Sequence, residues 1–283
     1  MHNIYSFCRS EMNKNSIFVP QKKAKNMTLT EFEPIIETIE EAYEIPQLNA
    51  TRRISALLPH NYYNSEKRYP VLYLQDGQNL FNPLAEYGDW AIDKSLGKLA
   101  EKGQADIIII AINHGEEERI NEYLPYYHPR FGEGKGNFYI EFMIEKLLPY
   151  VNKKYRTLTD FDNTGIGGSS MGGLISLHAG LSNPHVFGKL MIFSPSLWIS
   201  KKVFDNTKSF SPLEEAKIYL YSGGQESTEH LPNSKKLGAI IKEKMVKGYH
   251  IDFHFSINQE GNHSEVHWRK EFPKAIQWLF YNK

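Results

Sequence analysis

Short apolar runs alternate with longer amphipathic segments along most of this chain. The apolar runs contain residues that favour strands and are too short for ordinary helices, which is typical of strands buried inside a sheet. They predict strands at residues 51–58, 69–75, 106–112, 190–193, 218–221 and 251–257. Apolar residues spaced three and four apart predict helices at residues 90–99, 138–155, 237–245 and 272–280.

The alternation of strands and helices from residue 69 onward indicates the fold class. It favours an α/β fold with a mostly parallel central sheet and helices on both faces. Pro149 should kink or split its helix, whereas Pro273 should be tolerated in the first turn of the last helix. Residues 28–44 are acidic and only weakly periodic, and we assign them no element.

One domain accounts for the chain from residue 28 to residue 283. Of the 283 residues, 41% are hydrophobic, which is ample for one large core. The segment 1–27 is polar and patternless, so we expect a disordered tail there, with Met27 as an alternative start to Met1.

The segment TGIGGSSMGG carries the most informative motif. It passes from a short apolar strand through a glycine-flanked serine into residues with helical spacing. Gly168, Ser170 and Gly172 match G-x-S-x-G, the nucleophile elbow in which a sharp turn exposes a serine hydroxyl above a sheet. Ser169 competes for that role, but Met171 stands where a small residue is needed. A glycine-rich turn without a catalytic role gives the same pattern. A catalytic role for Ser170 therefore also requires a base and an acid elsewhere in the chain.

A catalytic serine needs an imidazole that accepts its proton. In α/β-hydrolases the acid and then the histidine follow the serine along the chain, each just past a strand end. His263 follows the last predicted strand and precedes the final helix, which suits the role of base. His267, four residues later, is the rival.

Glu226 is the candidate acid, because it comes just after the strand at 218–221 and before His263. Glu260 and Glu265 are closer to His263 in sequence. However, neighbouring side chains on one loop rarely reach the geometry of a triad. A solvated surface carboxylate is the alternative for Glu226.

An acyl-transfer site also needs hydrogen-bond donors for the oxyanion. The amide of Met171 directly follows the proposed nucleophile and points toward this position by construction of the elbow. A second donor comes from a loop after an early strand, here Asp76-Gly77-Gln78, and we choose the amide of Gln78.

The charge and cysteine content exclude several classes of function. Lysine plus arginine equals aspartate plus glutamate at 33 each, so nucleic-acid or membrane partners are not expected. Cys8 is the single cysteine, which excludes an internal disulfide framework. No apolar run has the length of a signal peptide or membrane span, so we expect a soluble, cytoplasmic protein. No pattern indicates an oligomeric state.

Two other motifs suggest rival chemistry. GEGKG resembles part of a phosphate loop, but Pro129 and Gly136 stand where that motif needs glycine and a hydroxyl residue. His263 and His267 are spaced like zinc ligands, but Ser264 stands where zinc proteases have glutamate. We therefore expect no nucleotide, metal or other cofactor.

Several segments together resemble the putative esterase family of α/β-hydrolases, which includes esterase D, feruloyl and acetyl-xylan esterases and ferric-siderophore esterases. The likeness extends from about Arg53 to the C-terminus. It rests on VLYLQDGQNLF, an Arg119-x-x-x-Tyr123 segment, EKLLPYVNKKYRT, GGSSMGG, FSPSLW, YLYSGGQE and GNHSEVHW. The tail before about Thr28 lies outside it.

Carried over position by position, the resemblance implies Ser170 as nucleophile, Glu226 as acid and His263 as base. Some siderophore-cleaving relatives use only a serine and a histidine, which leaves the role of Glu226 open. The resemblance also implies that three further side chains face the substrate pocket, namely Trp198, Arg119 and Tyr123. Core packing is the alternative for the two aromatic residues.

These residues predict a serine carboxylic-ester hydrolase that acts through an acyl-enzyme on a small or carbohydrate-linked ester. A ferric-siderophore trilactone esterase and an S-formylglutathione-type thioesterase are the alternatives of the same class. A catalytically silent binding protein with a hydrolase fold is the alternative without chemistry.

Overall fold

The protein was analysed as a computed structural model, which describes residues 31–282. The predicted tail at residues 1–27 and the alternative start at Met27 lie outside the described residues.

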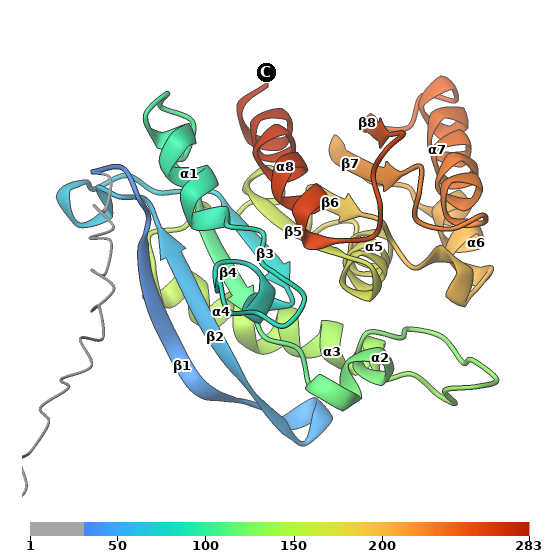
Figure 1. Cartoon of the computed structure of the whole chain (residues 1–283), viewed down its shortest axis with the longest axis horizontal. Coiled ribbons are helices and arrows are strands. Elements are labelled where there is room, and N and C mark those ends of the chain that lie inside the picture. Colours follow the sequence, from blue (N-terminus) through green and yellow to red (C-terminus); the bar gives the residue numbers. More distant parts are fainter. Residues whose placement is uncertain (1–30, 283) are drawn as a thin grey trace, which may run out of the picture.

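A single eight-stranded sheet crosses the described part of the chain, in the order β1-β2-β4-β3-β5-β6-β7-β8 (Figure 1). Strands β3 to β8 pair in parallel, whereas β1 with β2 and β2 with β4 are antiparallel. The mostly parallel sheet is therefore as predicted. The strands are β1 (Ile35–Ile45), β2 (Ala50–Leu58), β3 (Val71–Gln75), β4 (Ile108–Ile112), β5 (Thr164–Ser169), β6 (Lys189–Phe193), β7 (Ala216–Gly223) and β8 (Ile251–Asn258).

Helices cover both faces of the sheet, because alternate residues of each central strand point to opposite sides. On β3, for example, Leu72 and Leu74 join one core cluster with α1 and α8, whereas Val71 and Tyr73 join the other. The second cluster includes residues of α3 to α7. The helices are α1 (Ile92–Ala100), α2 (Arg119–Glu122), α3 (Gly136–Phe142), α4 (Leu148–Lys154), α5 (Met171–Ser182), α6 (Lys202–Ser209), α7 (His230–Val246) and α8 (Glu265–Ile276).

Three of these elements, β1, α2 and α6, were not predicted from the sequence. Strand β1 lies at the edge of the sheet, and most of its residues are partly or fully exposed, so its apolar alternation is weak. Four glutamates on this strand suit an exposed edge, where charge discourages pairing with other chains. Helix α6 is short, with only Val203, Phe204 and Thr207 buried.

The two proline predictions had different outcomes. A single turn of π-helix, Met143–Leu147, separates α3 from α4 just before Pro149, so the predicted helix is interrupted there. Proline has no amide hydrogen for the helical ladder, which explains the local change. The placement of Pro273 in a first turn is wrong, because α8 begins at Glu265 and Pro273 lies inside it.

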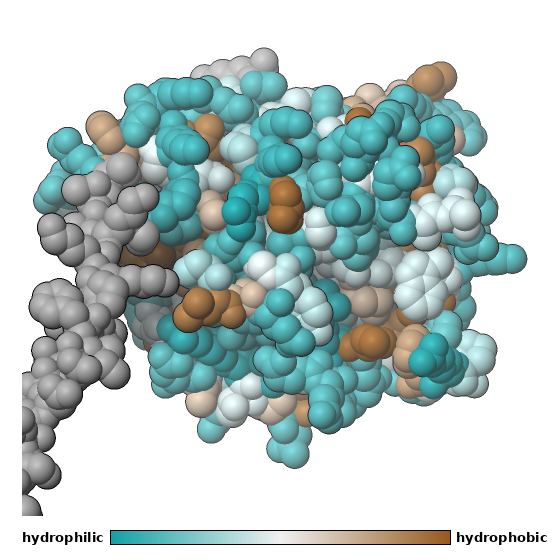
Figure 2. Space-filling model, viewed as in Figure 1, coloured by the Kyte–Doolittle hydropathy of each residue, from teal (hydrophilic) through white to brown (hydrophobic). Residues whose placement is uncertain are grey.

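The surface of the described part is mainly hydrophilic on the face drawn in Figure 2, where hydrophobic side chains are scattered singly or in small groups. Among the described residues, no helix combines the length and the apolar character needed to cross a membrane.

Candidate active site

Ser170 lies at a sharp turn between β5 and α5. Its backbone angles are φ 57° and ψ −121°, a conformation that is costly for a residue with a side chain. A Cβ atom on Gly168 would approach the carbonyl carbon of Gly172 to 2.9 Å, and one on Gly172 would approach Asp76 Oδ2 to 2.7 Å. The strand, turn and helix of a nucleophile elbow are therefore present, and glycine is required on both sides of the serine.

Glu226 and His263 form a close pair beyond the ends of β7 and β8. His263 Nδ1 donates a hydrogen bond of 2.6 Å to Glu226 Oε2. The other carboxylate oxygen accepts bonds of 2.6 Å from the Ser194 hydroxyl and of 2.6 Å from the Gly223 amide. Burial opposes ionisation of Glu226, but these hydrogen bonds and a nearby histidine, His230, hold its pKa below the usual range. The carboxylate can thus fix the orientation of the imidazole and stabilise its positive charge.

A second imidazole lies against the same carboxylate. His230, the first residue of α7, is buried, and its Nε2 is 3.0 Å from Glu226 Oε2. Burial lowers the pKa of His230, which favours its neutral form. Among the described residues, Glu226, His230 and His263 also form a group whose atoms are close enough to surround a metal ion. Ser194, Gly223 and His263 donate hydrogen bonds to the Glu226 carboxylate, whereas His230 Nε2 has no hydrogen-bond partner among the described residues.

Ser170 and His263 line the same cleft, which has a volume of about 920 Å³. No hydrogen bond joins the Ser170 hydroxyl to the His263 imidazole, and the hydroxyl lies 3.4 Å from Ser196 Oγ. Catalytic hydrogen bonds are often long before substrate binds. The rival base His267 is in α8, where its Nδ1 lies 3.3 Å from Asn258 Nδ2.

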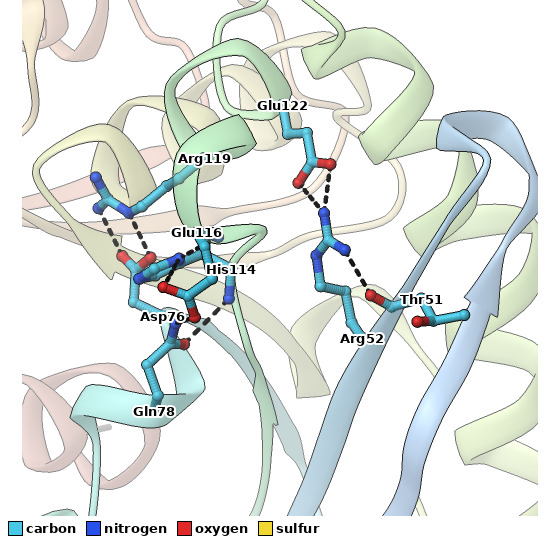
Figure 3. Close-up of polar contacts among 8 residues, drawn as sticks. All are labelled: Thr51, Arg52, Asp76, Gln78, His114, Glu116, Arg119 and Glu122. Carbon is cyan, nitrogen blue, oxygen red and sulfur yellow. Dashed lines mark hydrogen bonds and ion pairs between the residues drawn. The ribbon is translucent and has the colours of Figure 1, made fainter.

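The two candidate oxyanion donors belong to neighbouring turns. Met171 is the first residue of α5, so its amide has no acceptor within the helix. Gln78 lines the cleft on the short turn Gly77–Asn79 after β3. The side chain of Gln78 accepts a hydrogen bond of 3.1 Å from the amide of His114 and donates one of 3.3 Å to Glu116 (Figure 3). The turn is thereby tied to the segment after β4.

Arg119 also lines the cleft, where it is fixed by Asp76. Its Nε and Nη2 atoms donate bonds of 2.7 and 2.8 Å to the two oxygens of the Asp76 carboxylate (Figure 3). Burial opposes the charge of Arg119, but Asp76 more than compensates and raises the pKa of the guanidinium. A second ion pair, between Glu122 and Arg52 of β2, anchors the same segment.

The two aromatic candidates lie outside this cleft. Tyr123 is fully buried, with its ring 5.4 Å from the guanidinium carbon of Arg119, and it is not among the residues that line the cleft. Tyr123 therefore packs in the core, which was the alternative to a place in the substrate pocket. Trp198 is 57% exposed and borders a separate depression of about 310 Å³, which His230 also lines.

A known protein family matches most of this chain. The model of the family described as Putative esterase matches residues 45–279. The chain belongs to this esterase family. Among curated relatives, Uncharacterized protein YbbA from Bacillus subtilis is 28% identical to this esterase over 245 residues, which cover 81% of this chain and 92% of YbbA.

Two solved structures illustrate the shared fold. The BES protein from Bacillus cereus has a TM-score of 0.70 and 19% identity, and the match covers 99% of this esterase and 100% of that chain. The enterobactin esterase FES from Shigella flexneri has a TM-score of 0.67 and 20% identity, with 88% and 60% covered. These likenesses, together with the sheet, confirm the predicted α/β-hydrolase fold.

Four residues of this site were not singled out from the sequence: Ser194, His230, Asp76 and Trp268. Ser194 lies within the FSPSLW segment at a positive φ of 43°, and its hydroxyl accepts a bond of 2.9 Å from the indole of Trp268. His230 is the first residue of α7, and the turn that precedes it brings its side chain against Glu226. Because residues 226–229 form a turn, sequence spacing alone does not predict this contact.

Proposed function

We propose that this esterase is a serine carboxylic-ester hydrolase that acts through an acyl-enzyme. Ser170 is the nucleophile, His263 the general base and Glu226 the acid that orients it. The observation that carries the proposal is the strained elbow serine in one cleft with an imidazole that donates to a buried carboxylate at 2.6 Å.

The first half of the reaction forms the acyl-enzyme. Ser170 Oγ attacks the carbonyl carbon of the ester while its proton passes to His263 Nε2. The amides of Met171 and Gln78 stabilise the oxyanion. The intermediate then expels the alcohol, which takes the proton from His263, and the acyl group stays on Ser170.

The second half releases the acid. Water enters where the alcohol stood and gives a proton to His263 as its oxygen attacks the acyl carbon. The bond to Ser170 Oγ breaks, and His263 returns the proton to that oxygen. Glu226 stays ionised throughout and stabilises the imidazolium in both halves.

Hydrolysis of short p-nitrophenyl esters by Ser170→Ala tests the proposal. We expect turnover to fall by at least about a thousandfold with an unchanged circular-dichroism spectrum. Ser169→Ala is the matched control, since it removes the neighbouring hydroxyl that competes for the same role, and it should keep most activity. Substantial turnover by Ser170→Ala would refute the proposal.

A trilactone esterase is the second candidate, because the fold neighbours include an enterobactin esterase. A parallel screen of acetyl, feruloyl, S-formylglutathione and trilactone substrates would separate these candidates. The substrate with the highest kcat/KM identifies the class.

A further inference from the structure

The cleft at Ser170 has an excess of acidic side chains, although the whole chain has equal numbers of acidic and basic residues. Its acidic lining residues are Asp76, Glu86, Glu116, Glu117 and Glu265. Within the described part of the chain, Arg119 is the single lysine or arginine that lines it, and its charge is already paired with Asp76. The four glutamates have no lysine or arginine partner among the described residues.

Glu265 is the unusual member of this group. It is only 9% exposed, lines the cleft and is the first residue of α8, two positions after His263. No hydrogen bond or ion pair joins its carboxylate to another described side chain. Gly88, at the end of the loop that forms one wall, lies over it, since a Cβ there would be 3.8 Å from Glu265 Cβ. Burial raises the pKa of Glu265 and so opposes its charge, which a cation beside it in the cleft would stabilise.

Glu116 and Glu117 line the cleft from the segment after β4, which other contacts anchor. Glu116 has a positive φ of 49° and accepts a hydrogen bond from Gln78, while the Asp76–Arg119 pair fixes the turn beside it. Tyr87 is 70% exposed at the cleft. An aromatic face beside carboxylates is the usual environment for an ammonium group.

We propose that the cleft selects esters that carry a cationic group. Glu265 is the buried counter-ion of that group, and the negative charges of Glu86, Glu116 and Glu117 attract it to the cleft. The proposal rests on the function proposed above and names its substrate class. Carboxylates concentrated in a cleft raise the local concentration of a cationic substrate and lower that of an anionic one.

Three acetate esters of similar size test this selection. They are acetylcholine, its neutral isostere 3,3-dimethylbutyl acetate, and anionic 4-acetoxybutanoate. We expect kcat/KM to decrease in that order, by roughly tenfold per unit of charge at low ionic strength, and the spread to shrink at a salt concentration of about 0.5 M. Hydrolysis of p-nitrophenyl acetate is measured first, so that a protein without esterase activity is recognised as a failure of the proposed function instead.

Variants locate the effect. Glu265→Gln should reduce the ratio of cationic to neutral kcat/KM by about fivefold, and the double variant Glu86→Gln/Glu117→Gln by about threefold. The control Glu101→Gln/Glu145→Gln changes the net charge equally at exposed positions outside the cleft and should leave the ratio unchanged. Equal rates for the three esters, preference for the anion, or an equal effect of the control would overturn the proposal.

Discussion

Replacement of Glu226 by glutamine removes the negative charge beside His263 without removing the shape of the side chain. The Gly223 amide and the Ser194 hydroxyl both donate to one oxygen of Glu226. We therefore expect the amide oxygen of the introduced glutamine to take that position, which turns its NH₂ group toward His263 Nδ1. The imidazole would then carry its proton on Nε2, the nitrogen that must accept the proton of Ser170.

The loss can be estimated from the geometry. His263 Nδ1 and Glu226 Oε2 are 2.6 Å apart, so the centres of an imidazolium and a carboxylate lie roughly 4 Å apart. At an effective dielectric constant of about 20, two unit charges at that distance interact by about 4 kcal/mol. This interaction is made only when His263 is protonated in the transition state. It corresponds to a decrease of roughly a thousandfold in kcat/KM.

The assay is the hydrolysis of p-nitrophenyl acetate at about pH 7.5 by native protein, Glu226→Gln and the control Glu229→Gln. Glu229 is an exposed residue of the same turn, and its replacement should leave kcat/KM within about twofold, as surface substitutions usually do. A Glu226→Gln variant that folds normally and keeps more than about a tenth of native kcat/KM would refute the role of Glu226 and favour a serine–histidine dyad.

Three further results are expected from equilibrium unfolding. Gly172→Ala should lower the free energy of unfolding by about 1–3 kcal/mol because its Cβ would meet Asp76 Oδ2 at 2.7 Å. Alanine normally stabilises a helix, so a higher urea midpoint for this variant would contradict the expected clash. Arg119→Met should lower the free energy of unfolding by about 3 kcal/mol because it leaves the Asp76 carboxylate buried and unpaired. Arg130 is exposed, so Arg130→Met should change the stability little, and equal urea midpoints for the two variants would count against the Asp76–Arg119 pair. The depressed pKa of Glu226 contributes stability that is present above the unfolded value of about 4.5 and is lost as pH falls below it, so Glu226→Gln should flatten the decline of Tm between about pH 5 and 3. A decline of equal slope in both proteins would argue against that contribution.

The central strands and the elbow could be predicted because their signals are local. A continuous apolar run marks β3 and a β-branched run marks β4, and the spacing of Gly168 and Gly172 around Ser170 follows from steric limits within one turn. Chain order then placed the candidates Glu226 and His263 after successive strands, and parallel strands bring their C-terminal ends to one edge.

The remaining features depend on contacts between distant segments. The hydrogen bond from Ser194 to Glu226 joins residues 32 positions apart, and the pair of Asp76 with Arg119 joins residues 43 apart. No periodic pattern in the sequence indicates either contact. The surroundings of Glu265 likewise depend on side chains that several distant segments bring to one cleft.

Covalent labelling of Ser170 tests the central claim most directly. The native protein is treated with a fluorophosphonate, which reacts with an activated serine, and the modified residue is identified by peptide mass spectrometry. We expect a single adduct on Ser170, with loss of ester hydrolysis in proportion to labelling, and slow or no labelling of His263→Ala. An adduct on Ser169 or elsewhere, or full ester hydrolysis by protein labelled at Ser170, would contradict the account.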